Sequence, residues 1–286
     1  MKKSTILHLR FPFSFFLLPV FLLACATVEF QNNAHLILSF FILHFLVYPA
    51  SNGYNSYFDK DENSIGSLKN PPKVTKELYF VSLIMDAIAI FLSFTISLEF
   101  TIMVLIYGLV SKAYSHPSIR LKKFPIIDLL TAGFFQGYFT YLLSIVAIQD
   151  IRLSETFNYR IQMPGILSSV LLISSYPMTQ IYQHEEDARR GDLTVSRLMG
   201  VLGTFHFIAI AFTVANMGFA YYFVEYFGFQ SVIGYFLCLS PILVYFGRWY
   251  LKVRKDRHEA NYTYTMRLSL ISSLLLNGFF LYLWLS

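Results

Sequence analysis

Hydrophobic residues along the chain fall into nine long runs, which short polar segments separate. A helix needs ~20 mostly apolar residues to cross the ~30 Å hydrocarbon core of a bilayer, and each run approaches this length. We expect spanning helices at about residues 11–28, 34–51, 78–96, 98–114, 126–148, 163–181, 197–222, 229–250 and 264–285. The third and fourth runs are separated only by a tight turn near Ser97. The pattern predicts an all-α integral membrane protein.

The composition supports this fold class. Hydrophobic residues make up 56% of the chain and charged residues 14%, whereas soluble domains average ~25% charged residues. The formal net charge of +5 does not require nucleic acid as a partner, because basic loops mark the cytoplasmic face of membrane proteins. We therefore expect the lipid bilayer and no nucleic acid among the partners.

The positions of Lys and Arg predict the orientation. With nine spans, every Lys and Arg except Arg152 and Arg160 falls on one side of the membrane. The positive-inside rule then places the N-terminus in the cytoplasm and the C-terminus outside. We expect a multi-pass protein of a cell membrane, and specifically of a bacterial inner membrane.

Two acidic stretches follow predicted spans on this cytoplasmic side. Residues 52–66 read NGYNSYFDKDENSIG, and residues 182–192 read YQHEEDARRGD. Residues spaced by four lie on one face of a helix, and this spacing relates Asn55, Asp59 and Asn63 in the first stretch. Gln183 and Asp187 have the same spacing in the second stretch. We therefore expect the two stretches to face each other at the same membrane depth.

Facing carboxylates and amides repel one another unless a cation lies between them. Oxygen ligands of this kind suit Mg²⁺, which is often shared with substrate phosphates. The predicted metal ligands are Asn55, Asp59, Asn63, Gln183, Glu186 and Asp187.

A basic segment on the same side has the chemistry to bind a diphosphate. Residues 114–123 read YSHPSIRLKK, and Lys69 follows the first acidic stretch. Arg in particular binds phosphate oxygens in a bidentate manner. The predicted diphosphate ligands are Asn55, Lys69, Arg120, Lys122 and Lys123.

Together these motifs resemble those of the UbiA superfamily of intramembrane prenyltransferases. Asn55 and Asp59 match the first two positions of its N-x-x-x-D-x-x-x-D motif, and Asn63 stands at the third, with Asp61 as a substitute acid. Asp187 and Gly191 match the second motif, D-x-x-x-D-x-x-x-G, in which Gln183 replaces the first Asp and Glu185 or Glu186 supplies the missing charge. Residues 114–123, followed by Asp128, resemble the family's Y-S-x-P-x-x-R-L-K segment. Two family acids are amides here, which points to a divergent member.

The resemblance implies one UbiA-like domain over residues 1–286, with nine helices around a central chamber and a cytoplasmic cap of acidic loops. It also implies Mg²⁺-dependent transfer of a prenyl group from a prenyl diphosphate to an aromatic acceptor, through an allylic cation that aromatic faces stabilise. The predicted catalytic residues are Asp59, Asp61, Glu185 and Asp187, and Asp61, Glu185 and Asp59 are the candidate bases. The predicted prenyl-binding residues are Tyr54, Tyr57, Tyr107 and Tyr114.

Several alternatives remain open at this stage. The acceptor could be a naphthoate, a hydroxybenzoate, another phenol or polyene, or a glyceryl lipid. A transporter or a non-catalytic scaffold is the alternative class, although transporters usually bind their cargo near the bilayer midplane. Asp86 lies inside a predicted span and is a further functional candidate, while Gly133 and Gly137 predict a close helix contact.

Overall fold

The computed structural model describes all 286 residues, and its regular structure is helical throughout. The first part contains α1 (Lys3–Leu9), α2 (Phe11–Ser14), α3 (Leu18–Thr27), α4 (Asn33–Phe41), η1 (Ile42–Val47), α5 (Tyr48–Asp59), α6 (Lys76–Ser93), α7 (Leu98–Ser115) and η2 (Leu121–Lys123). The second part contains α8 (Pro125–Gly133), η3 (Phe134–Phe139), α9 (Thr140–Gln149), η4 (Leu153–Thr156), α10 (Tyr159–Gln180), α11 (His184–Arg190), α12 (Val195–Phe227), α13 (Phe229–Lys255), η5 (Arg257–Glu259) and α14 (Tyr262–Leu285).

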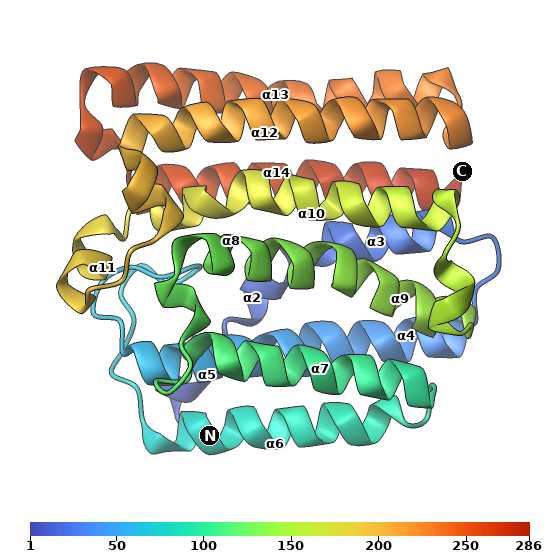
Figure 1. Cartoon of the computed structure of the whole chain (residues 1–286), viewed down its shortest axis with the longest axis horizontal. Coiled ribbons are helices and arrows are strands. Elements are labelled where there is room, and N and C mark those ends of the chain that lie inside the picture. Colours follow the sequence, from blue (N-terminus) through green and yellow to red (C-terminus); the bar gives the residue numbers. More distant parts are fainter.

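The helices form an elongated bundle, with α12 and α13 along one edge and α6 along the opposite edge (Figure 1). The short helix α11 lies at the same end of the bundle as the segment that follows α5 (Figure 1). The two acidic stretches therefore lie at one end, as their spacing from the apolar runs predicts.

Capping side chains account for several helix starts. Ser97 Oγ accepts a hydrogen bond from Phe100 N at 3.1 Å and caps α7, which a turn of four residues separates from the end of α6. Asn32, Asn158 and Asn261 cap α4, α10 and α14 in the same way. An N-cap oxygen satisfies an amide group that has no partner within the helix. The tight turn expected near Ser97 is thus confirmed.

Seven helical segments are long and apolar enough to cross a membrane: Lys3–Thr27, Asn33–Asp59, Leu98–Ser115, Pro125–Gln149, Val195–Phe227, Phe229–Lys255 and Tyr262–Leu285. The other two expected spans are helical as α6 and α10 but do not reach this apolarity. α6 contains Lys76, Glu77 and Asp86, and α10 contains two prolines and several Ser and Gln residues.

The first expected span, at 11–28, is not one continuous helix. Arg10 adopts a left-handed conformation (φ 49°) that ends α1, and Pro12 and Pro19 stand in the first turns of α2 and α3. Proline lacks the amide hydrogen that an interior position donates, so it favours the start of a new helix. Two short helices, α2 and α3, therefore replace the predicted one, and α1 precedes them.

Three glycine positions determine the shape of the bundle near its acidic end. A Cβ at Gly137 would lie 2.6 Å from the backbone of Ser169, and one at Gly133 would lie 2.3 Å from Ile173, so α8 and η3 approach α10 closely. This confirms the predicted close contact. Gly200 (φ 66°, ψ 173°) kinks α12 after its first turn, in a conformation that favours glycine.

Candidate active site

A cavity of about 230 Å³ lies at the acidic end of the bundle. Its walls come from α5, α7, α8, η3, α10 and α11, and residues of both acidic stretches line it. The polar mouth leads to an inner wall that includes Tyr107 and Phe135, whose ring centroids are 6.4 Å apart. The arrangement joins a charged entrance to an aromatic interior.

The first acidic stretch reaches the cavity from the last turn of α5. Asn55 and Asp59, one helical turn apart, both line it, and Asn55 Nδ2 donates a hydrogen bond to Ser115 Oγ at 2.9 Å. Asp59 forms an ion pair with Lys122. The helix ends here because Lys60 adopts a left-handed conformation (φ 50°). Asn63 therefore does not continue the helical face of Asn55 and Asp59, and its side chain is exposed.

The second acidic stretch reaches the cavity from the start of α11. Gln183 precedes the helix, and the backbone N–H of Asp187 donates to the Gln183 carbonyl at 2.9 Å. Both side chains line the cavity. Asp187 Oδ2 is buried without any hydrogen-bond partner. Burial, followed by the nearby charge of Asp192, raises the pKa of Asp187 to about 7.

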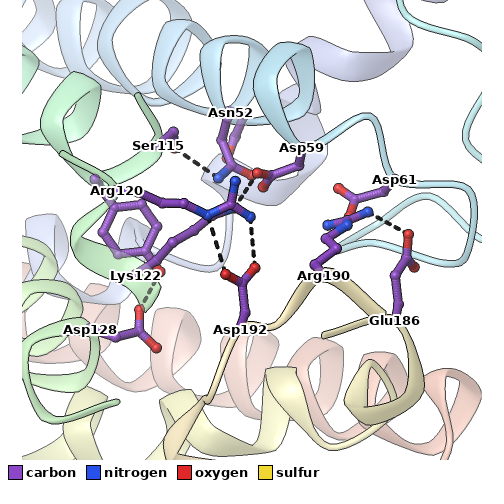
Figure 2. A network of polar contacts seen from close by, with 12 residues as sticks. Asn52, Asp59, Asp61, Ser115, Arg120, Lys122, Asp128, Glu186, Arg190 and Asp192 are labelled. Atoms are coloured by element: carbon purple, nitrogen blue, oxygen red, sulfur yellow. Dashed lines mark hydrogen bonds and ion pairs between the residues drawn. The ribbon is translucent and has the colours of Figure 1, made fainter. Parts of the chain in front are cut away.

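Arg190 joins the two acidic stretches directly. Its guanidinium donates to Asp61 Oδ1 at 2.6 Å and to Glu186 Oε1 at 2.5 Å. The Glu62 backbone N–H also donates to Glu186 Oε1, at 3.1 Å. Figure 2 shows Arg190 with Asp61 and Glu186 on either side. The expected convergence of these distant stretches is therefore present.

In the basic segment after α7, Lys122 lines the same cavity, and Arg120 lies outside its lining but binds the cavity residue Asp192. Lys122 pairs with Asp59, and Arg120 binds Asp192 in a bidentate manner, with N···O distances of 2.7 and 3.2 Å (Figure 2). The hydrogen bond to Asp192 raises the pKa of Arg120. Each of Asp59, Asp61 and Asp192 thus has a basic partner.

Several predicted residues lie away from the cavity. Asn63, Lys69, Lys123 and Glu185 are exposed, and the Lys123 ammonium lies over the Phe124 ring. Lys122 and Lys123 are adjacent in η2, but only the Lys122 side chain lines the cavity. Glu185 points outward because α11 presents Glu186 and Asp187 to the protein.

The predicted aromatic residues divide into two groups. Tyr107 and Tyr114 line the cavity. Tyr54 and Tyr57 instead pack against Tyr79 of α6, with ring centroids 5.9 and 5.2 Å apart. Asp86 also lies outside the cavity, where it pairs with Lys112 at 2.5 Å.

Several cavity residues that take part in its hydrogen bonds and ion pairs were not among the predicted site residues, notably Asp128, Tyr176, Gln180, Arg190 and Asp192. Arg190 and Asp192 lie within the second acidic stretch. Their roles in the site come from ion pairs with the distant residues Asp61 and Arg120, which the sequence does not reveal. Asp128 had a usable signal, since an acid inside an apolar run is a functional candidate by default.

The acidic side chains do not form a ready cluster of three or more carboxylate, His or Cys ligands around one point. The ion pairs with Lys122, Arg120 and Arg190 hold most of them apart. Asp187 is the cavity carboxylate with neither an ion pair nor a side-chain hydrogen bond.

The sequence profile of the UbiA prenyltransferase family matches residues 16–271 of the chain. No curated protein sequence gave a significant match.

Solved structures share the fold over nearly the whole length. A UbiA homologue from Archaeoglobus fulgidus, bound to DMAPP and Mg²⁺, is 15% identical with a TM-score of 0.69, covering 98% of this chain and 99% of that one. The same homologue bound to GPP and Mg²⁺ is 16% identical, with a TM-score of 0.68, covering 99% and 100%. A structure concerning digeranylgeranylglyceryl phosphate synthase is 16% identical, with a TM-score of 0.59, covering 98% of each chain.

Proposed function

Since the chain belongs to the UbiA prenyltransferase family, it is a prenyltransferase, and we propose that it transfers a prenyl group from a prenyl diphosphate to an aromatic acceptor in a Mg²⁺-dependent reaction. One observation carries this proposal. Asn55 and Asp59 of one acidic stretch and Gln183 and Asp187 of the other line a single cavity with an aromatic inner wall.

The residues of the cavity fit a hard divalent cation. Asp187 Oδ2 is buried without a partner, and Asn55 uses its amide nitrogen on Ser115, which leaves its oxygen for a ligand. We assign Asn55, Asp59, Gln183 and Asp187 as the residues that hold Mg²⁺. The exposed Asn63 is not assigned to this set, nor is Glu186, which does not line the cavity and is bound to Arg190. When bound, Mg²⁺ neutralises the charge that develops on the departing diphosphate.

The ion pairs of the site supply the diphosphate ligands. Lys122, Arg120 and Arg190 are now bound to Asp59, Asp192 and Asp61. A diphosphate at the cavity mouth offers these cations an alternative anionic partner, and their transfer to it frees the carboxylates to face a metal ion. Charge-assisted hydrogen bonds of Arg and Lys to phosphate are among the strongest in proteins.

The inner wall suits the isoprenoid. Tyr107 and Phe135 border the cavity beneath its polar mouth, and Tyr48 packs behind Tyr107 with ring centroids 5.9 Å apart. Aromatic faces attract a cation by ~0.5–2 kcal/mol and do not trap it covalently. We place the allylic end of the donor between these rings and the diphosphate-binding cations.

The same proposal includes the membrane topology. We propose a single domain with nine spans, in which α6, at one edge of the bundle, and α10 also cross the membrane (Figure 1). The polar Asp86 of α6 is covered there by its ion pair with Lys112 of the neighbouring α7. The basic residues then place the active-site end and its acidic cap in the cytoplasm.

A second acceptor class has support from one comparison. The structure concerning digeranylgeranylglyceryl phosphate synthase shares this fold, and its name implies a glyceryl lipid. An acceptor of that kind is the alternative to an aromatic ring.

The proposal is tested with purified protein, Mg²⁺, and prenyl diphosphates from geranyl to octaprenyl. Pyrophosphate release is measured with a hydroxybenzoate, a dihydroxynaphthoate or a geranylgeranylglyceryl phosphate as acceptor. We expect release with one of these classes, its loss on chelation of Mg²⁺, and its loss in Asp59→Ala and Asp187→Ala.

Asp256→Ala is the matched control, because Asp256 is an exposed acid in the α13–α14 connection and lies outside the cavity. It should leave release unchanged. Normal turnover by both Asp59→Ala and Asp187→Ala would show that the site is assigned wrongly.

A further inference from the structure

A buried carboxylate outside both acidic stretches forms one wall of the cavity. Asp128, in the first turn of α8, is 1% exposed and lines the cavity together with Tyr114 and Tyr176. Its Oδ1 accepts hydrogen bonds from Tyr114 Oη at 2.5 Å and Tyr176 Oη at 2.9 Å, and its Oδ2 accepts one from Gln180 Nε2 at 2.6 Å. Figure 2 shows Asp128 at the α8 side of the same group of polar side chains.

Three helices build this group of side chains. Tyr114 comes from the end of α7, Asp128 from α8, and Tyr176 and Gln180 from the end of α10. The two tyrosine hydroxyls also share a hydrogen bond. Gln180 is held in turn by the Ser196 backbone N–H, which donates to its Oε1 at 3.3 Å. The carboxylate is therefore fixed in position by a connected set of donors.

Asp128 differs from the other acids of the cavity. Asp59, Asp61 and Asp192 are each committed to Lys or Arg, and Asp187 belongs to the set assigned to Mg²⁺. Asp128 has no ion pair, and neutral donors occupy both of its oxygens. Such a group suits neither metal binding nor diphosphate binding, but it can receive a proton through the hydroxyls bound to it.

The proposed reaction needs such a group whichever acceptor is used. The C1–O bond of the donor breaks and its electron pair leaves on the diphosphate. An electron pair of the acceptor, from a ring or from a hydroxyl oxygen, forms the new bond to C1. The acceptor then carries a positive charge until its C–H or O–H proton departs, so a base must take up one proton in each turnover.

The bases considered from the sequence are poorly placed for this step. The carboxylates of Asp59 and Asp61 are occupied by ion pairs with Lys122 and Arg190, and Glu185 is exposed outside the cavity. Asp128 lies on the cavity wall, behind two hydroxyl groups that reach the cavity themselves.

We propose that Asp128 is the proton acceptor of the transfer reaction, with Tyr114 and Tyr176 as the hydroxyls through which the proton passes. The acceptor proton moves to a tyrosine oxygen while that hydroxyl's own proton moves to the Asp128 carboxylate. Proton and electrons balance, since the products are the prenylated acceptor, diphosphate and one protonated carboxyl group, which releases its proton before the next turnover. This assignment rests on the proposed prenyl transfer.

The test compares wild type with Asp128→Asn, which keeps the size and polarity of the side chain but removes its basicity. We expect kcat to fall at least ~10²-fold, the lower end of the contribution of a general base. The Kd for geranyl thiolodiphosphate with Mg²⁺, a donor analogue that ionises poorly, should not change. Replacing the departing acceptor hydrogen with deuterium should slow kcat of the variant and not of the wild type, because proton removal then limits the rate.

Two further variants separate chemistry from structure. Tyr176→Phe removes one hydroxyl beside the carboxylate and should lower kcat less than Asp128→Asn does. Tyr222→Phe is the control, because Tyr222 is a buried tyrosine that donates one hydrogen bond, to the Arg160 carbonyl, away from the cavity. It should leave kcat unchanged.

The possible outcomes are distinct. If Asp128→Asn keeps its kcat, or loses donor binding in proportion to kcat without an isotope effect, Asp128 is not the proton acceptor, although the prenyl transfer stands. If wild type releases no pyrophosphate with any donor and acceptor of the panel, the proposed function fails and the assignment of Asp128 fails with it.

Discussion

Arg190 Nη1 lies 2.6 Å from Asp61 Oδ1, although the two residues are 129 positions apart in the chain. This contact ties the segment after α5 to α11. The same guanidinium also binds Glu186 within α11, so one cation holds the two acidic stretches at the mouth of the cavity.

Arg190→Gln should therefore weaken both the fold and the site. The Asp61 and Glu186 side chains are each 7% exposed, and a buried group that loses its hydrogen-bond partner costs ~1–3 kcal/mol. We expect a lower melting temperature in detergent and a higher KM for the donor. Arg189→Gln, which changes the exposed neighbour, is the control. Equal melting temperatures for the two variants would show that Arg190 does not hold the two acidic stretches together.

Lys122 and Lys123 provide a neighbouring pair with opposite surroundings. Lys122 lines the cavity, whereas Lys123 is exposed. A hydrogen bond to a charged group contributes ~1.5–3 kcal/mol, so Lys122→Ala should raise the donor KM about tenfold or more. Lys123→Ala should change it little. Steady-state kinetics with geranyl diphosphate measures both, and a larger effect at Lys123 would overturn the proposed diphosphate site.

The raised pKa of Asp187, about 7, predicts that metal binding depends on pH. A carboxylate ligand must lose its proton to bind Mg²⁺, so Mg²⁺ affinity should rise from pH 6 to pH 8. Calorimetric titration with MgCl₂ at several pH values measures this, and Asp187→Asn should flatten the dependence.

The metal-free protein should show the opposite trend in stability. The pKa of Asp187 is raised on folding from 3.8 to about 7, so its contribution to stability is fully present below the unfolded pKa and is lost as pH rises towards 7. The melting temperature difference between wild type and Asp187→Asn should change in this window. A difference that is constant from pH 4 to pH 8 would contradict the burial of an unpaired carboxyl group.

Gly137→Ala tests the close approach of η3 to α10. The new Cβ would lie 2.6 Å from the Ser169 backbone, which cannot move as a side chain can, and overpacking of this kind costs ~1–3 kcal/mol. Gly247→Ala, in α13 with no neighbouring atom within 4 Å, is the control and should be neutral or stabilising. Thermal unfolding in detergent compares the two, and equal stability would show that the helices separate easily.

The helices themselves could be predicted, because apolar runs of membrane length and their polar boundaries are local features of the sequence. The pairs Asn55–Asp59 and Gln183–Asp187 could also be predicted, since a spacing of four needs only a helical turn. The prediction failed to extend to Asn63 because the left-handed conformation of Lys60 ends α5. Lysine seldom adopts a left-handed conformation, so nothing in the sequence indicated that the helix ends at this residue.

Which charged side chains form ion pairs in the site could not be predicted from the sequence. Nothing local distinguishes Lys122 from Lys123, or Arg190 from Arg189, because the difference lies in which residue faces a partner over 60 positions away. Asp128 was visible as an acid beside an apolar run, but its three hydrogen-bond donors come from two other helices.

The kink at Gly200 divides α12 into two parts with different surroundings. The first turn carries Ser196, which contacts Gln180 and His184 near the site, and the remainder is a long helix with much of its apolar surface exposed. Long spanning helices adjust to bilayer thickness by tilting. A flexible joint at Gly200 would absorb such a tilt, so that membranes of different thickness leave the spacing of the catalytic groups undisturbed.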